Sequence, residues 1–258
     1  MSLLGELIDV LSRFTVDDVL HFEEMYDEQF HALRYLYSKS TNNDVFIALV
    51  LMNSTVSYQL SCSGERWWWE FARYFSDIKS ISLEKLPEKF AMFLSESRCG
   101  GRLRQQKLSR IRRAWSLIRL YAQRLEWLIK NQKTFTIKLA RTLNASVSAK
   151  TIVFTAKMLN YALRIVTKQR IVAPMELDIP LDSRIRAISK ALCIEDPLTF
   201  WRELSRKLRI PPLHLDSLLW VGLRLAEDLS VAEKFIGDRK LAEYIEVMRK
   251  IREAMRSR

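Results

Sequence analysis

A lysine lies at the start of a predicted helix in the segment LNASVSAKTIVFTAKMLNYA, which begins at Leu143 and opens with a short polar turn. Phe154 and Lys157 follow Lys150 at i+4 and i+7, so the three side chains share one helix face. The positive end of the helix dipole and the nearby cation Lys157 would both favour a neutral amine on Lys150. A neutral amine is a nucleophile and can form a Schiff base, although two solvated lysines on a basic face explain the same spacing.

Two carboxylates with possible chemical roles lie in the C-terminal third of the chain. Asp182 follows Pro180 by two residues and precedes a helical pattern, where it would cap the helix. A capping carboxylate can also stabilise a developing positive charge or accept a proton. Asp216 and Trp220 share a helix face, and an acceptor beside an aromatic ring suits a planar base with N–H groups. The alternative is a buried tryptophan next to a surface carboxylate.

Three consecutive tryptophans, Trp67 to Trp69, would point in three directions on a helix. We expect that at least one of them lines a groove or a second interface. The segment RCGGRLRQQKLSRIRR, from Arg98, holds seven basic residues and no acid, which favours phosphate binding over a simple solvated helix. The side chains expected to contact phosphates are those of Arg102, Arg104, Lys107, Arg110 and Arg113.

The charge of the whole chain supports a polyanionic partner. The 258 residues include 42 Lys and Arg against 30 Asp and Glu, a net charge of +12. Residues 98–175 hold 18 of the basic residues and one acid, whereas the remaining residues hold 24 basic and 29 acidic residues. A nucleic acid is the natural partner of such a block, and an acidic membrane surface is the second candidate.

Other classes of protein are poorly supported. The cysteines, Cys62, Cys99 and Cys193, form no CxxC pair, and no two histidines have the spacing of metal ligands, so we expect neither a metal site nor a disulfide framework. Six glycines argue against a glycine-rich phosphate loop. The longest apolar run, Val45 to Met52, is too short to span a bilayer, and the first residues lack the basic region of a signal peptide. We therefore expect an intracellular protein without a cofactor.

The elements that position these residues are predicted to be helices. Apolar residues recur at three- and four-residue spacing along almost the whole chain, which predicts an all-α fold of a dozen or so helices. The residues 170–180, with two prolines, are expected to form a non-helical linker, and Gly237 is expected to end a short helix. Helix starts are expected at Thr15, Asn43, Pro87, Asp196–Pro197 and Pro211–Pro212.

Several separated motifs together resemble one family of proteins. KTIVFTAKMLNYA from Lys150, DIPLDSR from Asp178 and IPPLHLDSLLW from Ile210 are similar to the archaeal GO glycosylase (AGOG) family, a branch of the helix-hairpin-helix DNA glycosylases. EQF from Glu28 and GERWWWEFARYF from Gly64 extend the resemblance over most of the chain. The usual LPGVG hairpin is absent, which fits the atypical hairpin of the archaeal branch, and no four-cysteine motif for an iron–sulfur cluster follows.

The resemblance implies two helical lobes with a central cleft. Residues 1–24 and 176–258 would form one lobe, and residues 25–175 would form the other, which carries the hairpin Asn144–Ala149 and the Lys150 helix. It also implies a bifunctional DNA N-glycosylase and abasic-site lyase that flips 8-oxoguanine out of the duplex. Lys150 would be the nucleophile and Schiff-base lysine, and Asp182 its partner carboxylate. The implied base pocket consists of Gln29, Trp68, Phe154, Lys157, Asp216 and Trp220.

The resemblance further implies a partner and a location. The partner would be double-stranded DNA that contains 8-oxoguanine, with single-stranded DNA as a further candidate, and the enzyme would act as a monomer without a membrane. It would work in the cytoplasm of an archaeal cell, in association with the nucleoid.

Three alternatives remain open at this point. Charge and aromatic residues are equally typical of a non-catalytic helical nucleic-acid-binding protein, which would need neither Lys150 nor Asp182. A glycosylase for another lesion, such as an alkylated purine, would be distinguished by competition between duplexes that carry 8-oxoguanine, alkyladenine and uracil. A membrane-surface protein would need a helix with a wholly basic polar face, and residues 102–130 come close to this pattern.

Overall fold

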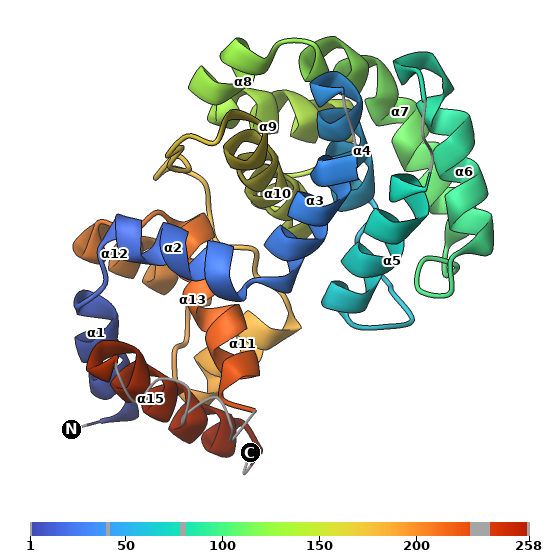
Figure 1. Ribbon diagram of the computed structural model, residues 1–258. Coiled ribbons are helices and arrows are strands. Elements are labelled where there is room, and N and C mark those ends of the chain that lie inside the picture. The colour runs from blue at the N-terminus through green and yellow to red at the C-terminus, as the bar shows by residue number, and fades with distance from the viewer. Residues whose placement is uncertain (1, 40–41, 78–80, 228–237, 257–258) are drawn as a thin grey trace. The chain divides into compact units, whose positions relative to one another are not determined.

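The computed structural model describes residues 2–39, 42–77, 81–227 and 238–256, which fold into helices without a strand (Figure 1). This confirms the all-α class predicted from the sequence. Two compact units divide the chain: unit 1 comprises Met1–Asp27 and Pro174–Arg258, and unit 2 comprises Glu28–Ala173. The boundaries expected from the sequence, 24/25 and 175/176, lie close to these. None of the described helices is long and apolar enough to cross a membrane.

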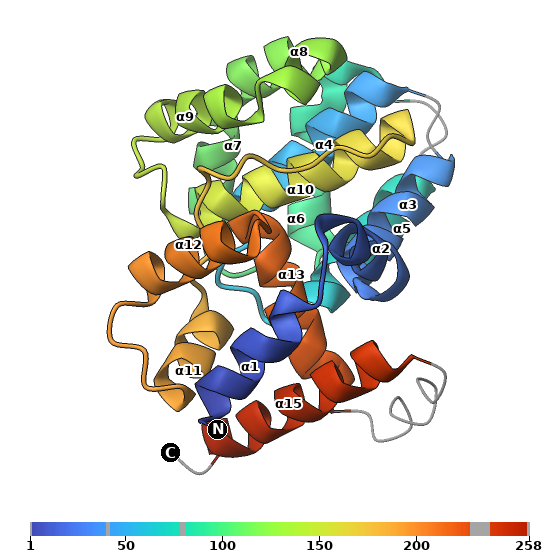
Figure 2. The same cartoon turned by 90° about the vertical axis from the view of Figure 1, so that its left-hand side faces the viewer.

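Unit 2 surrounds a central buried helix. Every residue of α4 from Val45 to Thr55 is buried, because Val45–Met52 is apolar on all sides and neighbouring helices cover the helix. The helices α10 and α7 pack against α4, and Figures 1 and 2 both show α10 beside it. The elements of unit 2 are α3 (Glu28–Lys39), α4 (Asn43–Thr55), α5 (Gly64–Ser76), the 3-10 turn η1 (Leu83–Lys85), α6 (Leu86–Glu96), α7 (Arg104–Ala122), α8 (Leu125–Lys130), α9 (Gln132–Thr142) and α10 (Lys150–Thr167).

Unit 1 joins the beginning of the chain to its C-terminal third. Helix α2 packs against α13, and α1 packs against α15 (Figure 2). The first two helices of the chain therefore share one core with helices from its C-terminal third. A buried polar cluster lies in this core, where His214 Nδ1 is 2.9 Å from Glu23 Oε1 and Ser217 Oγ donates to the same oxygen. The elements of unit 1 are α1 (Leu3–Ser12), α2 (Val16–Tyr26), α11 (Ser183–Ala191), α12 (Pro197–Leu208), α13 (Pro212–Leu225) and α15 (Arg239–Arg256).

Most of the expected helix starts agree with the structure. Thr15 caps α2, and its hydroxyl and the Asp18 carboxylate form a reciprocal capping box. Asp196 caps α12, with Pro197 in its first turn. The expectation for Asn43 is wrong by one residue, because Asn42 is the cap and accepts a hydrogen bond from Val45 N. The expected helix end at Gly237 lies outside the described residues.

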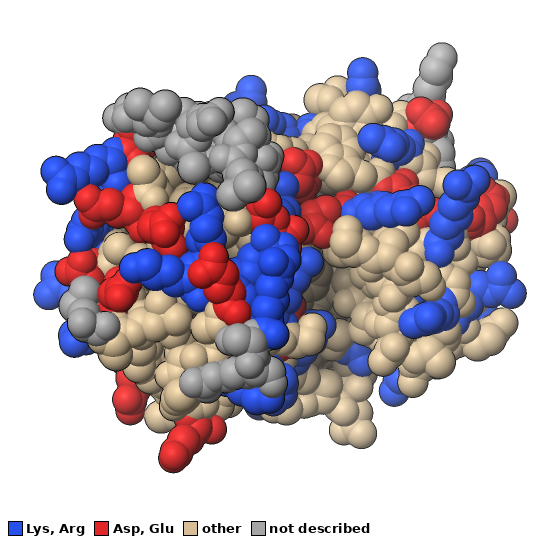
Figure 3. Space-filling model, turned by 90° about the horizontal axis from the view of Figure 1, so that it is seen from below, with Lys and Arg blue, Asp and Glu red and all other residues tan. Residues whose placement is uncertain are grey.

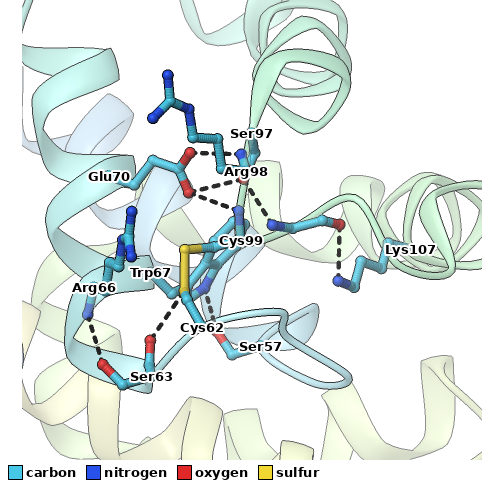
Figure 4. Close-up of a disulfide and its surroundings, with 11 residues drawn as sticks. Ser57, Cys62, Ser63, Arg66, Trp67, Glu70, Ser97, Arg98, Cys99 and Lys107 are labelled. Carbon is cyan, nitrogen blue, oxygen red and sulfur yellow. Dashed lines mark hydrogen bonds between the residues drawn. A yellow bond between two sulfur atoms is a disulfide. The ribbon is translucent and has the colours of Figure 1, made fainter.

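A disulfide in unit 2 corrects the expectation that the cysteines form no framework. Cys62 and Cys99 are bonded to each other, and Cys193 is a free, exposed thiol. The bond joins the loop before α5 to the loop after α6 (Figure 4). Ser61 N also donates to Cys99 O across the same junction. The cysteines are 37 residues apart in sequence, a spacing that carries no local signal of pairing.

The loop that holds Cys99 is fixed from two further sides. Glu70 of α5 accepts hydrogen bonds from Arg98 N at 2.7 Å and from Cys99 N at 3.1 Å (Figure 4). A side chain on Gly100 would lie 2.6 Å from the ring of Trp67, so only glycine permits this close approach. The start of the basic segment is therefore held firmly against α5.

We expect reduction of the disulfide to destabilise the protein. A cross-link over 37 residues lowers the entropy of the unfolded chain, and its loss costs up to about 4 kcal/mol of unfolding free energy. Urea unfolding of the wild type and of Cys62→Ser, each with and without reductant, measures the effect. Cys193→Ser is the matched control. A wild-type midpoint that does not move under reductant would contradict the expectation.

Candidate active site

Lys150 is the first residue of α10, directly after a turn without glycine. In this turn Asn144 takes a left-handed backbone, with φ of 48°, and Ala149 N donates to Ser146 O. Ala149 is the N-cap residue and offers no side-chain oxygen to the first amides of the helix. Lys150 is exposed, as a nucleophile must be if it is to reach a substrate.

Two aromatic rings lie along the same part of unit 2. Phe154, one turn after Lys150, is half-buried, and its ring centroid lies 6.2 Å from that of Trp68. Trp68 is fully buried, yet its indole Nε1 has no hydrogen-bond partner among the described residues. A buried indole N–H normally has a partner, so this donor is suited to a ligand.

The other two tryptophans have ordinary structural roles. Trp67 is buried and donates to Ser57 Oγ at 2.9 Å, so two of the three rings enter the same core. Trp69 is partly buried at the edge of that core and donates to Glu28 Oε2. Trp69 also lines a surface pocket with Arg73 and Arg98, which fits the expectation that at least one ring lines a groove, whereas the implied base pocket uses Trp68.

Lys157 and Gln29 are both buried in unit 2. Lys157 is 2% exposed, and its ammonium lies 5.7 Å from the ring centroid of Tyr161. The alternative of two solvated lysines on one basic face is thus wrong for Lys157, while Lys150 is exposed. Gln29, in the first turn of α3, is 4% exposed.

Asp182 caps α11 in unit 1, as the sequence predicts. Its Oδ1 accepts hydrogen bonds from Arg184 N and Ile185 N, both at 2.9 Å. Both bonds use the same oxygen, so the cap leaves the second carboxylate oxygen to other partners. Asp182 is half-buried, which is compatible with a role at a substrate.

Asp216 and Trp220 are both buried in α13, at 5% and 8% exposure. The alternative of a surface carboxylate at Asp216 is therefore wrong. The guanidinium of Arg184 lies 4.4 Å from the ring centroid of Trp220, and this contact joins the Asp182 cap to the tryptophan within unit 1. Sequence reasoning missed Arg184, although its position two residues after Asp182 was visible.

Asn53 is a second residue that sequence reasoning missed. Its side chain is fully buried in α4, and neither the oxygen nor the nitrogen of its carboxamide has a hydrogen-bond partner among the described residues. A buried polar group without a partner costs about 1–3 kcal/mol, so its retention favours a functional role. The available signal was an asparagine directly after the longest apolar run, within the same helix.

The basic segment divides into exposed and buried side chains. Arg102, Arg104 and Arg113 are exposed, in accord with a role at phosphates. The expectation that Lys107 contacts a phosphate is wrong, because Lys107 is fully buried and its ammonium donates to Gly100 O at 2.9 Å (Figure 4). On the face in Figure 3, Asp and Glu atoms lie among Lys and Arg atoms, so this face is not uniformly basic.

The burial of Lys107 predicts a pH-dependent stability. Removal from water lowers the pKa of Lys107 to about 8, whereas a lysine in an unfolded chain titrates near 10.4. Between these two pKa values the unfolded chain binds more protons at Lys107 than the folded protein does. The free energy of unfolding therefore rises with pH in this range.

The measurement compares the wild type with Lys107→Met by urea unfolding at pH 7.5 and pH 10. We expect the unfolding free energy of the wild type minus that of the variant to rise with pH by as much as about 3 kcal/mol. Lys130→Met, which removes an exposed lysine, should show no such rise. Equal differences at the two pH values would show that Lys107 keeps its ordinary affinity for protons.

No group of three or more His, Cys, Asp or Glu residues in the described part of the chain could hold a metal ion. The candidate residues therefore offer an amine, two carboxylates, aromatic rings and buried amides. An exposed amine suits covalent catalysis at an electrophilic carbon, and buried rings with polar groups suit a planar heterocycle.

Comparison with known proteins gives the class. The model of the AGOG family, described as N-glycosylase/DNA lyase, matches residues 8–254. An N-glycosylase/DNA lyase from Methanopyrus kandleri is 39% identical over 82% of this chain and 86% of its own length, and one from Thermococcus kodakarensis is 38% identical over 83% and 82%. The 8-oxoguanine DNA glycosylase from Pyrobaculum aerophilum, solved in complex with 8-oxoguanosine, is 25% identical with a TM-score of 0.79 and covers 95% of this chain and 96% of its own.

These matches and the helical fold define a DNA glycosylase that is also a lyase. The chain belongs to the AGOG family of N-glycosylase/DNA lyases. DNA is therefore the substrate, and the alternatives of a non-catalytic nucleic-acid-binding protein and a membrane-surface protein are set aside.

Proposed function

We propose that this enzyme excises 8-oxoguanine from DNA and cleaves the strand through an imine on Lys150. The observation that carries the proposal is the exposed amine of Lys150 at the start of α10, in a chain that belongs to the AGOG family. The 8-oxoguanine specificity of the Pyrobaculum aerophilum relative supports the choice of base.

Binding begins at the phosphates. The exposed Arg102, Arg104 and Arg113 attract the DNA backbone and offset the few kcal/mol that unstacking and unpairing a base cost. The flipped purine then stacks on aromatic rings, for which Phe154, Trp68 and Trp220 are the candidates. Asp216 and Lys157 are the candidates for charged contacts to a base.

Selectivity requires a group that detects oxidation. Guanine has a bare N7 acceptor, whereas 8-oxoguanine carries a hydrogen on N7 and a carbonyl oxygen on C8. The amide oxygen of Gln29 would accept from the new N7–H, and the unpaired Nε1–H of Trp68 is suited to donate to an oxygen of the base. An acceptor that faces the lone pair of guanine costs about 1–3 kcal/mol, so guanine would be rejected.

Chemistry takes place at C1′ of the flipped nucleotide. The lone pair of the Lys150 amine forms a bond to C1′ as the bond from C1′ to the base nitrogen breaks. The base leaves with the electron pair of the broken bond and takes up a proton. Asp182 stabilises the positive charge that builds on the sugar. Opening of the sugar ring gives an imine, and loss of a C2′ proton then expels the 3′ phosphate by β-elimination.

The test is base release from duplexes that differ in one nucleotide. Identical duplexes carry 8-oxoguanine, an alkyladenine, uracil or unmodified guanine, and single-turnover release is measured with enzyme in excess. We expect release of 8-oxoguanine at least about tenfold faster than that of any other base. Preferred release of alkyladenine or uracil would instead establish a glycosylase for another lesion.

A further inference from the structure

Arg110 lies at the meeting point of three helices of unit 2. It belongs to α7, its Nε donates to Thr55 O at the end of α4, and its Nη2 donates to Thr151 Oγ1 in the first turn of α10. Its guanidinium also lies 6.0 Å from the ring centroid of Tyr58, in the segment that follows α4. One planar side chain thus joins the central buried helix to the residue next to Lys150.

The start of α10 lacks a capping side chain, as do the starts of α6, α7, α8, α9 and α13. Helices α2, α4, α5, α11 and α12 each begin at a side chain that accepts a hydrogen bond from a first-turn amide. Helix α10 begins at Ala149, which has no such side chain. Lys150 therefore stands at a helix end without side-chain capping, directly beside the hydroxyl that Arg110 holds.

We propose that Arg110 is a positioning residue that fixes the first turn of α10, and with it the amine of Lys150, relative to the core of unit 2. The forked guanidinium suits this role, since two of its nitrogen atoms reach two acceptors on different helices at once. Arg110 was expected to contact a phosphate, but these bonds direct it into the protein. The inference rests on the proposed role of Lys150 as the Schiff-base lysine.

If Arg110 positions Lys150, its loss should lower the rate of the chemical step without weakening the binding of DNA. A displaced amine attacks C1′ more slowly even when DNA is fully bound, because nucleophilic attack depends steeply on geometry. A lost phosphate contact weakens binding and lowers the slope of log affinity against log salt by about 1. The two roles of an arginine in this segment therefore predict opposite results.

The experiment traps the imine with borohydride on a duplex that already contains an abasic site, at saturating DNA, and measures DNA affinity at several salt concentrations in parallel. We expect Arg110→Met and Arg110→Lys to lower the trapping rate constant by about ten- to a hundredfold, with affinity and salt slope close to wild type. Arg110→Lys keeps the charge but not the fork, so a wild-type rate in this variant would overturn the proposal. A weaker affinity with an unchanged rate in Arg110→Met would also overturn it.

Two further variants keep the test decisive if Arg110 proves necessary for folding. Thr151→Val removes only the acceptor hydroxyl and should lower the rate severalfold, and it should add little to Arg110→Met in the double variant. Full additivity of the two changes would contradict a shared role. Arg112→Met removes an exposed charge from the same helix and is the control.

Failure of the proposed function gives a different result from failure of this inference. Trapping on an abasic duplex does not depend on which base the enzyme excises, so a wrong choice of lesion leaves the test intact. If Lys150→Gln still forms the trapped adduct, the assignment of Lys150 fails, whatever Arg110 does.

Discussion

Lys150→Gln is expected to abolish the borohydride-trapped adduct on a duplex with a single 8-oxoguanine and to lower the rate of base release by at least about a thousandfold. Glutamine is of similar length but has no basic lone pair, so it can form neither the bond to C1′ nor the imine. DNA binding should survive, because exposed arginines elsewhere in unit 2 supply the phosphate contacts.

The matched control for this change is Lys168→Gln. Lys168 is exposed and is the C-cap residue of α10, at the opposite end of the helix from Lys150. The substitution therefore makes the same chemical change and removes the same charge. It should trap at the wild-type rate. A covalent band with Lys150→Gln would place the reactive nitrogen on another residue.

Asp182→Asn is expected to lower the rate of base release by about a hundredfold or more while leaving stability unchanged. Asparagine caps a helix as well as aspartate does, so the bonds to the amides of Arg184 and Ile185 persist. The change removes the negative charge that opposes the positive charge on the sugar, with little effect on structure. Single-turnover release and thermal unfolding together separate the two effects.

Two variants complete this design. Asp182→Ala loses the cap as well as the charge and should unfold with about 1 kcal/mol less free energy than Asp182→Asn. Asp196→Asn makes the same chemical change at the cap of α12 in the same unit and should react normally. Full activity in Asp182→Asn would show that Asp182 only caps α11 and has no role in base release.

Local rules predicted the helices well, because the signals that set a helix start lie within a few residues of it. Thr15 with Asp18, and Asp196 with Pro197, each contain the whole capping interaction in the sequence. Asn42 and Asn43 show the limit of such rules. Two adjacent residues of one type can each cap a helix, and only the packing of α4 decides between them.

Contacts between distant segments could not be predicted in this way. The pairing of Cys62 with Cys99 depends on how α5 and α6 pack, and nothing near either cysteine indicates it. In sequence, Lys107 cannot be told from its solvated basic neighbours. In the fold it is buried, and its ammonium donates a hydrogen bond to Gly100 O. The candidate site shows the same division: Lys150 and Asp182 were proposed from local position and from resemblance, whereas the contacts of Arg184, Asn53 and Arg110 depend on the fold.

The interrupted chain of unit 1 has a consequence for synthesis on the ribosome. Helix α2 buries Val19 and Phe22 and packs against α13, which begins at Pro212. At about 5–20 residues per second, α2 leaves the ribosome roughly ten to forty seconds before its partner helix is made. Unit 2 is continuous from Glu28 to Ala173 and is complete before α13 emerges. The nascent chain therefore passes through a stage in which unit 2 is folded while an apolar N-terminal arm is still exposed, and this arm is the segment on which a chaperone would act.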